Sequence, residues 1–192
     1  AEALYGVQTL RGIENFSISK FRLSEYPLFI KGLAITKMAA AMANFELGLL
    51  TVEQKDAIIA ACGEILDGKH HDQFPVDMIQ GGAGTTTNMN ANEVIANRAL
   101  ELMGHERGEY QYCSPNDHVN CSQSTNDAYP TAIHIGMYFK HLQLLPHLEE
   151  LIASFRKKGE EFSQIIKMGR TQLEDAVPMT LGQTFNGFAS ID

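Results

Sequence analysis

The chain has 192 residues, the length of one large domain or two small ones at roughly 150 residues per domain. A hydrophobic fraction of 44% and a charged fraction of 20% are ordinary globular values and allow a sizeable core. The 15 basic and 23 acidic side chains give a formal net charge of −8, which argues against a nucleic-acid-binding protein. An anionic ligand would therefore have to be held by local donors and not by the overall field.

Five helical segments are predicted, and in chain order they cover residues 27 to about 48, 51–68, 90–103, 124 to about 162, and 179 onward. Less regular segments are predicted between them: an arm over 1–26, a polar connector over 70–75, a Gly-rich loop over 81–84, a short strand over 109–112, a turn over 114–117 and a loop over 168–178. The chain is therefore expected to be mainly α.

Local signals define where several of these helices begin. Pro27 suits a first helical turn, and Thr51 with Gln54 forms a capping box in which each side chain satisfies an orphan amide. Asn90 and Glu93 are interpreted as capping partners for the third helix.

The remaining local features point to a reduced, non-membrane protein. The cysteines form no CxxC pair, which argues against a zinc site and favours free thiols in the cytoplasm. We expect no signal peptide, and no membrane span because no apolar run approaches roughly 18 residues. Both ends of the chain resemble the interior of a longer polypeptide, so we expect both to be cut.

Three polar segments, 84–90, 122–127 and 169–175, are rich in small donors, and the first two are poor in charge. The first places three threonine hydroxyls at a helix start, which makes either an anion site or a simple cap cluster. It is not a phosphate loop, because no Gly-Lys-Ser/Thr follows and no strand precedes it. The second has more uncharged polar residues than one cap needs, which suggests a ligand with several acceptor oxygens such as a carboxylate.

The third segment leaves two interpretations open. Arg170 could hold a carboxylate through two parallel hydrogen bonds, or it could pair with Glu174 or Asp175. No Gly-x-Ser-x-Gly elbow occurs and the seven histidines are scattered, so local motifs indicate no catalytic triad.

The same segments resemble, in order and spacing, the signature segments of the fumarase/aspartase superfamily over essentially the whole chain. The matching runs are 81–85 with 88–94, 122–127, and 169–173 with 181–183. The runs 108–112 and 167–183 are more similar to the aspartate ammonia-lyase branch than to the class II fumarases.

The resemblance implies a reversible elimination that converts L-aspartate to fumarate and ammonia. It passes through an aci-carboxylate, a dianionic end of the substrate that needs several preorganised donors. The substrate-binding residues implied by the resemblance are Thr85, Ser124, Thr125, Asn126, Thr171 and Gln172. The last two belong to a segment that joins the site from another subunit in this superfamily.

Two departures from the superfamily pattern affect the chemistry. Many members have His where this chain has Gln172, and Gln cannot take a proton, so we expect binding or orientation there. The superfamily's basic serine lies on a Gly-Ser-Ser-x-x-Met-Pro loop that does not occur in these residues. The 192-residue chain is therefore expected to be an N-terminal fragment that is inactive alone.

The resemblance also implies the organisation of the protein. Residues 1–121 correspond to a mostly helical N-terminal domain, and 122–192 to the truncated start of a central helical bundle that drives a homotetramer. An isolated start of the bundle leaves its apolar stripe exposed, so we expect this chain to associate.

We expect a small-molecule substrate, no nucleic acid and no membrane partner. No cofactor is expected to be required; Mg²⁺ activates some members, but nothing here resembles an octahedral oxygen cage.

Two alternative functions stay open at this point. Within the superfamily, the nearest alternative is a class II fumarate hydratase; argininosuccinate and adenylosuccinate lyases differ more in the matching segments. An alternative of another class is a non-catalytic helical assembly module that kept the anion-binding donors.

Overall fold

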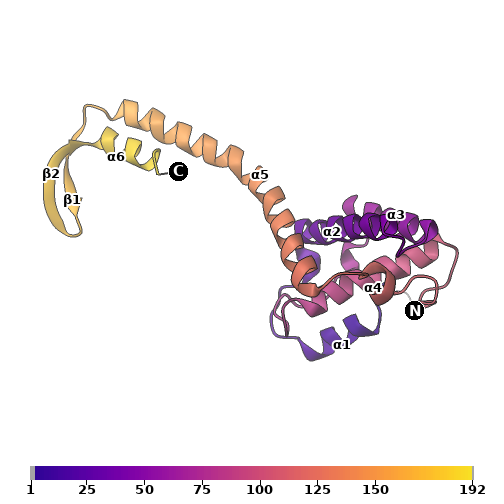
Figure 1. Ribbon diagram of the computed structural model, residues 1–192. Coiled ribbons are helices and arrows are strands. Elements are labelled where there is room, and N and C mark those ends of the chain that lie inside the picture. The colour runs from indigo at the N-terminus through magenta and orange to yellow at the C-terminus, as the bar shows by residue number, and fades with distance from the viewer. Residues whose placement is uncertain (1–2, 192) are drawn as a thin grey trace. The chain divides into compact units, whose positions relative to one another are not determined.

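The computed structural model describes residues 3–191 and divides the chain into two compact units, 1–139 and 140–192. The chain is mainly helical, as the sequence predicts (Figure 1). In chain order the elements are α1 (Val7–Asn15), α2 (Pro27–Glu46), α3 (Val52–Leu66), α4 (Thr85–Leu102), α5 (Thr125–Glu161), β1 (Ile166–Thr171), β2 (Glu174–Thr180) and α6 (Leu181–Phe188). Short 3₁₀ helices cover Leu23–Glu25 and His71–Gln73, and a π-helix covers Pro115–Val119.

Helices α2 and α3 begin and end where local chemistry predicts. Pro27 occupies the first turn of α2, and Gly48, at φ 74°, follows its last turn. The Thr51–Gln54 capping box is confirmed, with Gln54 N donating to Thr51 Oγ1 at 3.2 Å and Thr51 N to Gln54 Oε1 at 3.1 Å. These caps satisfy amides that a helix start otherwise leaves without partners.

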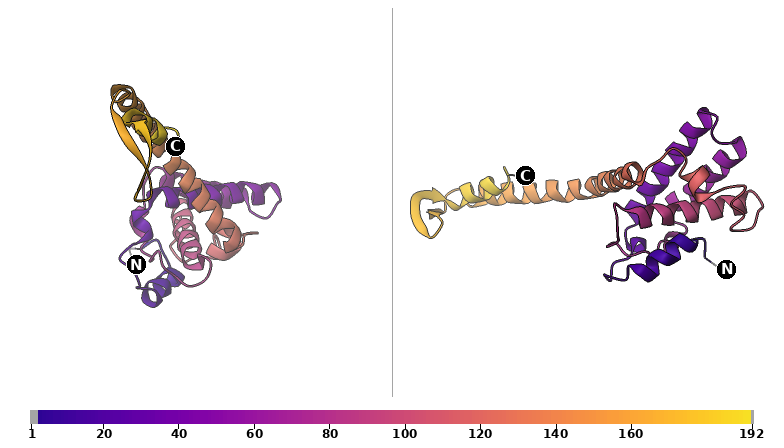
Figure 2. Two further views of the ribbon diagram at one scale, coloured as in Figure 1. Left: turned by 90° about the vertical axis from the view of Figure 1, so that its left-hand side faces the viewer. Right: turned by 60° about the horizontal axis from the view of Figure 1, so that its bottom comes forward.

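The core of the first unit lies between α2, α3 and α4. Helix α2 runs along α3, and α3 packs on α4 (Figure 1 and Figure 2). Fully buried apolar side chains from these helices meet there, among them Ile30, Leu33, Ile58, Ile65, Val94 and Leu100. Contrary to our expectation, α2 is long and apolar enough to cross a membrane by length and composition. Its apolar face is packed in this core, which is the position of a core helix.

The N-terminal arm is not irregular, because it contains α1. The carboxylate of Glu93 accepts hydrogen bonds from the amides of Gly6, Gln8 and Thr9 at 2.8 to 2.9 Å, and from the Thr9 hydroxyl at 2.6 Å. A side chain from α4 thus caps α1. The assignment of Glu93 as a cap of its own helix was therefore wrong.

Two further expectations from the sequence were wrong. Helix α4 begins at Thr85 and not at Asn90, because Gln80 caps it from the preceding loop. The segment 109–112 forms turns and not a strand. The turn predicted over 114–117 opens a π-helix, in which the Ser114 hydroxyl accepts from the amides of Asn116 and Asp117.

The first part of α5 packs closely on α2 within the first unit. A Cβ on Gly32 would lie 2.2 Å from the Ala132 carbonyl oxygen, and one on Gly136 would lie 3.1 Å from the Leu28 carbonyl oxygen. The two backbones therefore approach each other through glycines that no larger residue could replace without movement.

In the second unit, the predicted loop over 168–178 is instead an antiparallel hairpin of β1 and β2. Met168 pairs with Pro178, and Arg170 pairs with Asp175. Between these pairs β1 has one residue and β2 has two, so β2 contains a β-bulge. Thr180 caps the start of helix α6, and its hydroxyl accepts from Gln183 N at 3.1 Å.

The second unit has little interior of its own. Helix α6 packs on α5 through the rings of Phe155, Phe162, Phe185 and Phe188. The buried residues among 140–191 are small: Gly159, Gly169, Gly182 and Ala189. The division into compact units falls inside α5, after residue 139, whereas the domain boundary predicted at 121/122 concerns the superfamily fold and stays a prediction.

Candidate functional site

The first candidate site element is the N-terminus of α4. Gly84 precedes it in the left-handed conformation at φ 86°. Gln80 Oε1 accepts a hydrogen bond from the Thr87 amide, and Gln80 Nε2 donates one to the Thr87 hydroxyl, both at 2.8 Å. Within residues 3–191 the amides of Thr85 and Thr86 find no acceptor, and the exposed Thr85 hydroxyl makes no hydrogen bond. Unpaired amides beside a free hydroxyl at a helix start suit an anion.

The second element is the N-terminus of α5. The Ser124 hydroxyl accepts from Asn126 N at 3.1 Å, and Ser124 N donates to Asp127 Oδ2 at 3.2 Å, so Ser124 and Asp127 cap the helix. The exposed Asn126 side chain has no hydrogen-bond partner in the described part of the chain. Capping thus accounts for Ser124 but leaves the Asn126 amide available to a ligand.

The structure brings these two helix starts together. Asn88, 2% exposed in the second turn of α4, donates to the Thr125 hydroxyl at 3.2 Å. A Cβ on Gly84 would lie 2.2 Å from the Tyr129 ring, so the start of α4 lies directly against the first turns of α5. The predicted residues Thr85, Ser124, Thr125 and Asn126 therefore belong to one region of the first unit.

A buried polar network lies behind this region. The amine of Lys37, fully buried on α2, donates to Asn120 Oδ1 and to Gln123 Oε1, both at 2.9 Å. Burial lowers the pKa of Lys37 to about 7, and the Cys62 thiol interacts with it electrostatically. Burial raises the pKa of Cys62 itself to about 12, so that thiol stays neutral.

Sequence reasoning missed Lys37, Asn120 and Gln123 as parts of this region. The available signal was a lysine within an otherwise apolar, alanine-rich helix, because a buried charged residue requires partners. Asn120 Oδ1 also accepts from Asn88 Nδ2 at 3.0 Å and from Asn92 Nδ2 at 3.2 Å. The network therefore joins α2, α4 and the segment before α5.

Thr171 and Gln172 lie in the second unit, at the exposed turn of the hairpin. Thr171 ends β1, and Gln172 has a left-handed backbone at φ 53°. Leu173 beside them is 92% exposed. Arg170 forms an ion pair, as one of its two interpretations predicted, and its Nη2 lies 3.4 Å from Asp175 Oδ1.

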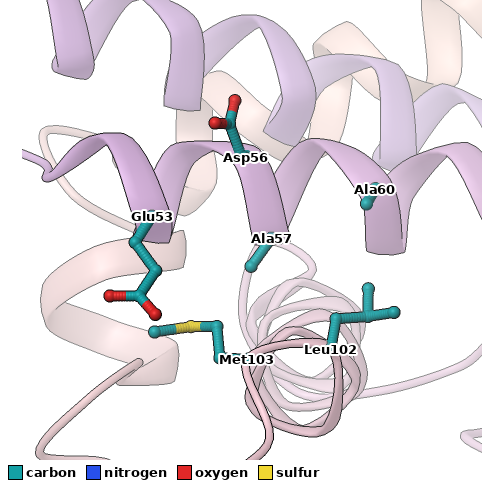
Figure 3. Close-up of a pocket in the computed structure, with 6 residues that line it drawn as sticks. All are labelled: Glu53, Asp56, Ala57, Ala60, Leu102 and Met103. Atoms are coloured by element: carbon teal, nitrogen blue, oxygen red, sulfur yellow. The ribbon is translucent and has the colours of Figure 1, made fainter.

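A separate surface hollow of about 490 Å³ lies between α3 and the end of α4. Figure 3 shows Glu53 and Met103 pointing toward one another across it, and Asp56 also lines it. It contains none of the predicted site residues, and its two carboxylates disfavour an anionic ligand. Among residues 3–191 there is also no group of three or more His, Cys, Asp or Glu side chains that could hold a metal ion.

Comparisons with known proteins identify the family. A family model described as lyase matches residues 1–191. The chain is 60% identical over 190 residues to the aspartate ammonia-lyase of Pseudomonas canavaninivorans, covering 99% of this chain and 40% of that protein. It is 58% identical over 190 residues to the aspartate ammonia-lyase of Escherichia coli K12, covering 98% and 40%.

Solved structures show the same relationship. A fumarate lyase:delta crystallin of Brucella melitensis, bound to cobalt, is 54% identical with a TM-score of 0.91, covering 99% of this chain and 41% of that one. The class II fumarase of Schistosoma mansoni is 40% identical with a TM-score of 0.84, covering 98% and 40%. The chain thus spans about 40% of the length of the curated relatives that it matches. It belongs to the lyase family, the fumarase/aspartase superfamily that its polar segments resemble.

Proposed function

We propose that the full-length protein containing this chain is an aspartate ammonia-lyase, which eliminates ammonia reversibly from L-aspartate to give fumarate. The observation that carries the proposal is the pair of joined helix starts, where the Thr85 hydroxyl and the Asn126 side chain have no hydrogen-bond partner within residues 3–191. The names of relatives that are 58% to 60% identical support the same substrate.

In this proposal the donors of the first unit bind a substrate carboxylate. Removal of the proton next to the β-carboxylate places a second negative charge on that group, forming the aci-carboxylate. Donors fixed in advance stabilise this dianion more than the substrate, and that difference lowers the barrier. Thr85, Ser124, Thr125 and Asn126 are the proposed donors, together with the amides at the start of α4.

The proposed basic residue is a serine on a loop outside residues 1–192, so this chain alone has no lyase activity. Gln172 carries no transferable proton at neutral pH, and with Thr171 it binds or orients the substrate. We assign these two residues to a site completed by other subunits of a homotetramer. The small interior of the second unit supports association, because apolar side chains such as Leu142, Leu145 and Leu151 are exposed there.

The boundary of the N-terminal domain is proposed at 121/122, next to the site segment that starts α5. The domain organisation and a cytoplasmic location follow from the superfamily. No metal or cofactor is required in the proposed reaction, since the charge that develops is met by hydrogen-bond donors.

An assay of the full-length protein tests the function. Fumarate formation is followed by absorbance with L-aspartate and, separately, with L-malate. We expect turnover of L-aspartate, and at least about a tenfold loss of kcat/KM in Asn126→Ala because a donor to a developing charge is removed. Asn15→Ala, which changes an exposed asparagine at the end of α1, is the matched control and should retain full activity.

Three outcomes contradict the proposal. Faster turnover of L-malate favours the class II fumarase alternative, to which the 40% identity with the Schistosoma enzyme also points. No turnover of either substrate favours a non-catalytic assembly module. Unchanged kinetics in Asn126→Ala remove Asn126 from the substrate site.

A further inference from the structure

One charged side chain lies behind the candidate site with no acidic partner. Lys37 is 0% exposed, and in the described part of the chain its amine donates to two amide oxygens and forms no ion pair. Placing an amine in a protein interior costs free energy through lost hydration. A methionine of similar length would fill the same space without that cost, so packing alone does not explain a lysine here.

The two acceptors of Lys37 shape the segment before α5. Gln123 Nε2 donates to the carbonyls of Val119 at 2.9 Å and Cys121 at 3.1 Å, while Asn120 Nδ2 donates to the Gln123 carbonyl at 3.0 Å. The segment is thereby folded around the lysine amine. Ser122 within it takes a left-handed backbone at φ 56°, which an unrestrained serine rarely adopts.

The same acceptors reach α4. Asn120 Oδ1, which accepts from Lys37, also accepts from Asn88 Nδ2, and Asn88 Nδ2 in turn donates to the Thr125 hydroxyl. Lys37 is therefore two hydrogen bonds away from Asn88 on α4 and three away from Thr125 at the start of α5. Such networks are cooperative, so loss of one member loosens the others.

We propose that Lys37 is a positioning residue, which holds the starts of α4 and α5 in the arrangement that binds the substrate carboxylate. The inference rests on the proposed function, since it assigns Lys37 to the same site. Lys37 acts through Asn120 and Gln123 and does not itself contact the substrate.

The test compares Lys37→Met with Lys31→Met in the full-length protein. Lys31 lies on the same helix, is partly exposed, and makes no hydrogen bond or ion pair within residues 3–191, so it controls for the loss of a lysine from α2. We expect the KM for L-aspartate to rise about tenfold or more in Lys37→Met and to stay within about twofold in Lys31→Met. A merely structural role would reduce the amount of folded enzyme, and hence the apparent kcat, without changing KM.

A second readout does not depend on activity. Amide hydrogen exchange measured by mass spectrometry should accelerate over residues 120–128 in Lys37→Met and not in Lys31→Met. If the wild-type protein does not convert L-aspartate, the proposed function fails, while the exchange rates still decide whether Lys37 positions the segment. Unchanged exchange and unchanged KM in folded Lys37→Met overturn the inference.

Two further variants strengthen the design. If Lys37 acts through the start of α5, the KM of Lys37→Met combined with Asn126→Ala should be close to that of the worse single variant. If the two substitutions instead raise KM by the product of their separate effects, Lys37 does not act through the start of α5. If Lys37→Met does not fold, Gln123→Leu, which removes one acceptor of the amine, should give the same rise in KM and the same accelerated exchange; normal values in that variant refute the inference.

Discussion

Removal of the Glu93 carboxylate should release the N-terminal arm from the first unit. Glu93 is 2% exposed on α4 and accepts four hydrogen bonds from the start of α1, three from amides and one from the Thr9 hydroxyl. In Glu93→Ala all four donors lose their acceptor. Thr9 is 0% exposed, so water cannot replace the carboxylate without local opening.

The cost can be worked from these contacts. A hydrogen bond to a charged group contributes about 1.5–3 kcal/mol, and each buried donor that is left without an acceptor costs about 1–3 kcal/mol. Four bonds to one carboxylate are not additive, because opening of α1 lets water reach several donors at once. We therefore expect Glu93→Ala to lower the free energy of unfolding by about 3–5 kcal/mol, a large share of the 5–15 kcal/mol typical of a domain.

The assay is urea unfolding of the 192-residue chain followed by far-ultraviolet circular dichroism. Glu14→Gln, an exposed site on α1, is the matched control and should remain within about 0.5 kcal/mol of wild type. Hydrogen exchange should locate the loss, with faster exchange at Gly6, Gln8 and Thr9. A loss below about 1 kcal/mol in Glu93→Ala would refute the reasoning that this carboxylate anchors α1.

Three further predictions concern pH and association. Hydrogen bonds from Arg98 hold the pKa of Glu64 at about 2, below its ordinary 4.5, so stabilisation present above pH 4.5 is lost as pH falls toward 2. The urea midpoint should therefore drop more between pH 6 and pH 3 in wild type than in Glu64→Gln; equal drops contradict this. Burial lowers the pKa of Lys37 from 10.5 to about 7, so between these values the unfolded chain binds the extra proton and stability rises with pH. The stability of wild type relative to Lys37→Met should therefore rise from pH 7 to pH 9, whereas parallel curves would contradict it. Light scattering of the 192-residue chain should show association that Leu142→Glu with Leu145→Glu weakens; a clean monomer at high concentration argues against an exposed apolar contact surface.

The helices that the sequence predicted well are those whose signals act within a few residues. The Thr51–Gln54 capping box and the glycines after α2 and α3 act within one helical turn, and each is found where expected. Helix α1 was missed because its cap, Glu93, is 84 to 87 residues away from the amides that it accepts. Local patterns carry no information about such a partner.

The hairpin was missed for a related reason. Gly169 and Pro178 indicate a loop by composition, yet both lie in the paired strands, next to the bulge that offsets Met168 from Arg170. Glycine and proline are tolerated in a strand at such irregular positions. Pairing with the neighbouring strand, and not strand propensity, decides this segment.

The candidate site divides in the same way between local and distant causes. Thr85 and the run 124–126 could be singled out because donors at a helix start have a recognisable composition. The buried Lys37 could not, since its acceptors are 83 and 86 residues further along the chain. The residues that would touch a ligand were thus accessible to sequence reasoning, while those that hold them in place were not.

Helix α4 shows why the polar residues of this chain were difficult to interpret. Its asparagines and Glu93 suggest caps by composition, but they lie in the middle of the helix and are buried. Asn90 donates to the backbone at Gln73, Asn97 donates to the backbone at Leu4, and Glu93 caps α1. These buried polar side chains of α4 therefore attach other segments of the chain to it, where apolar side chains would only fill space. Because the same helix presents Thr85 at its start, the segments that hold α4 in place also hold one half of the candidate site.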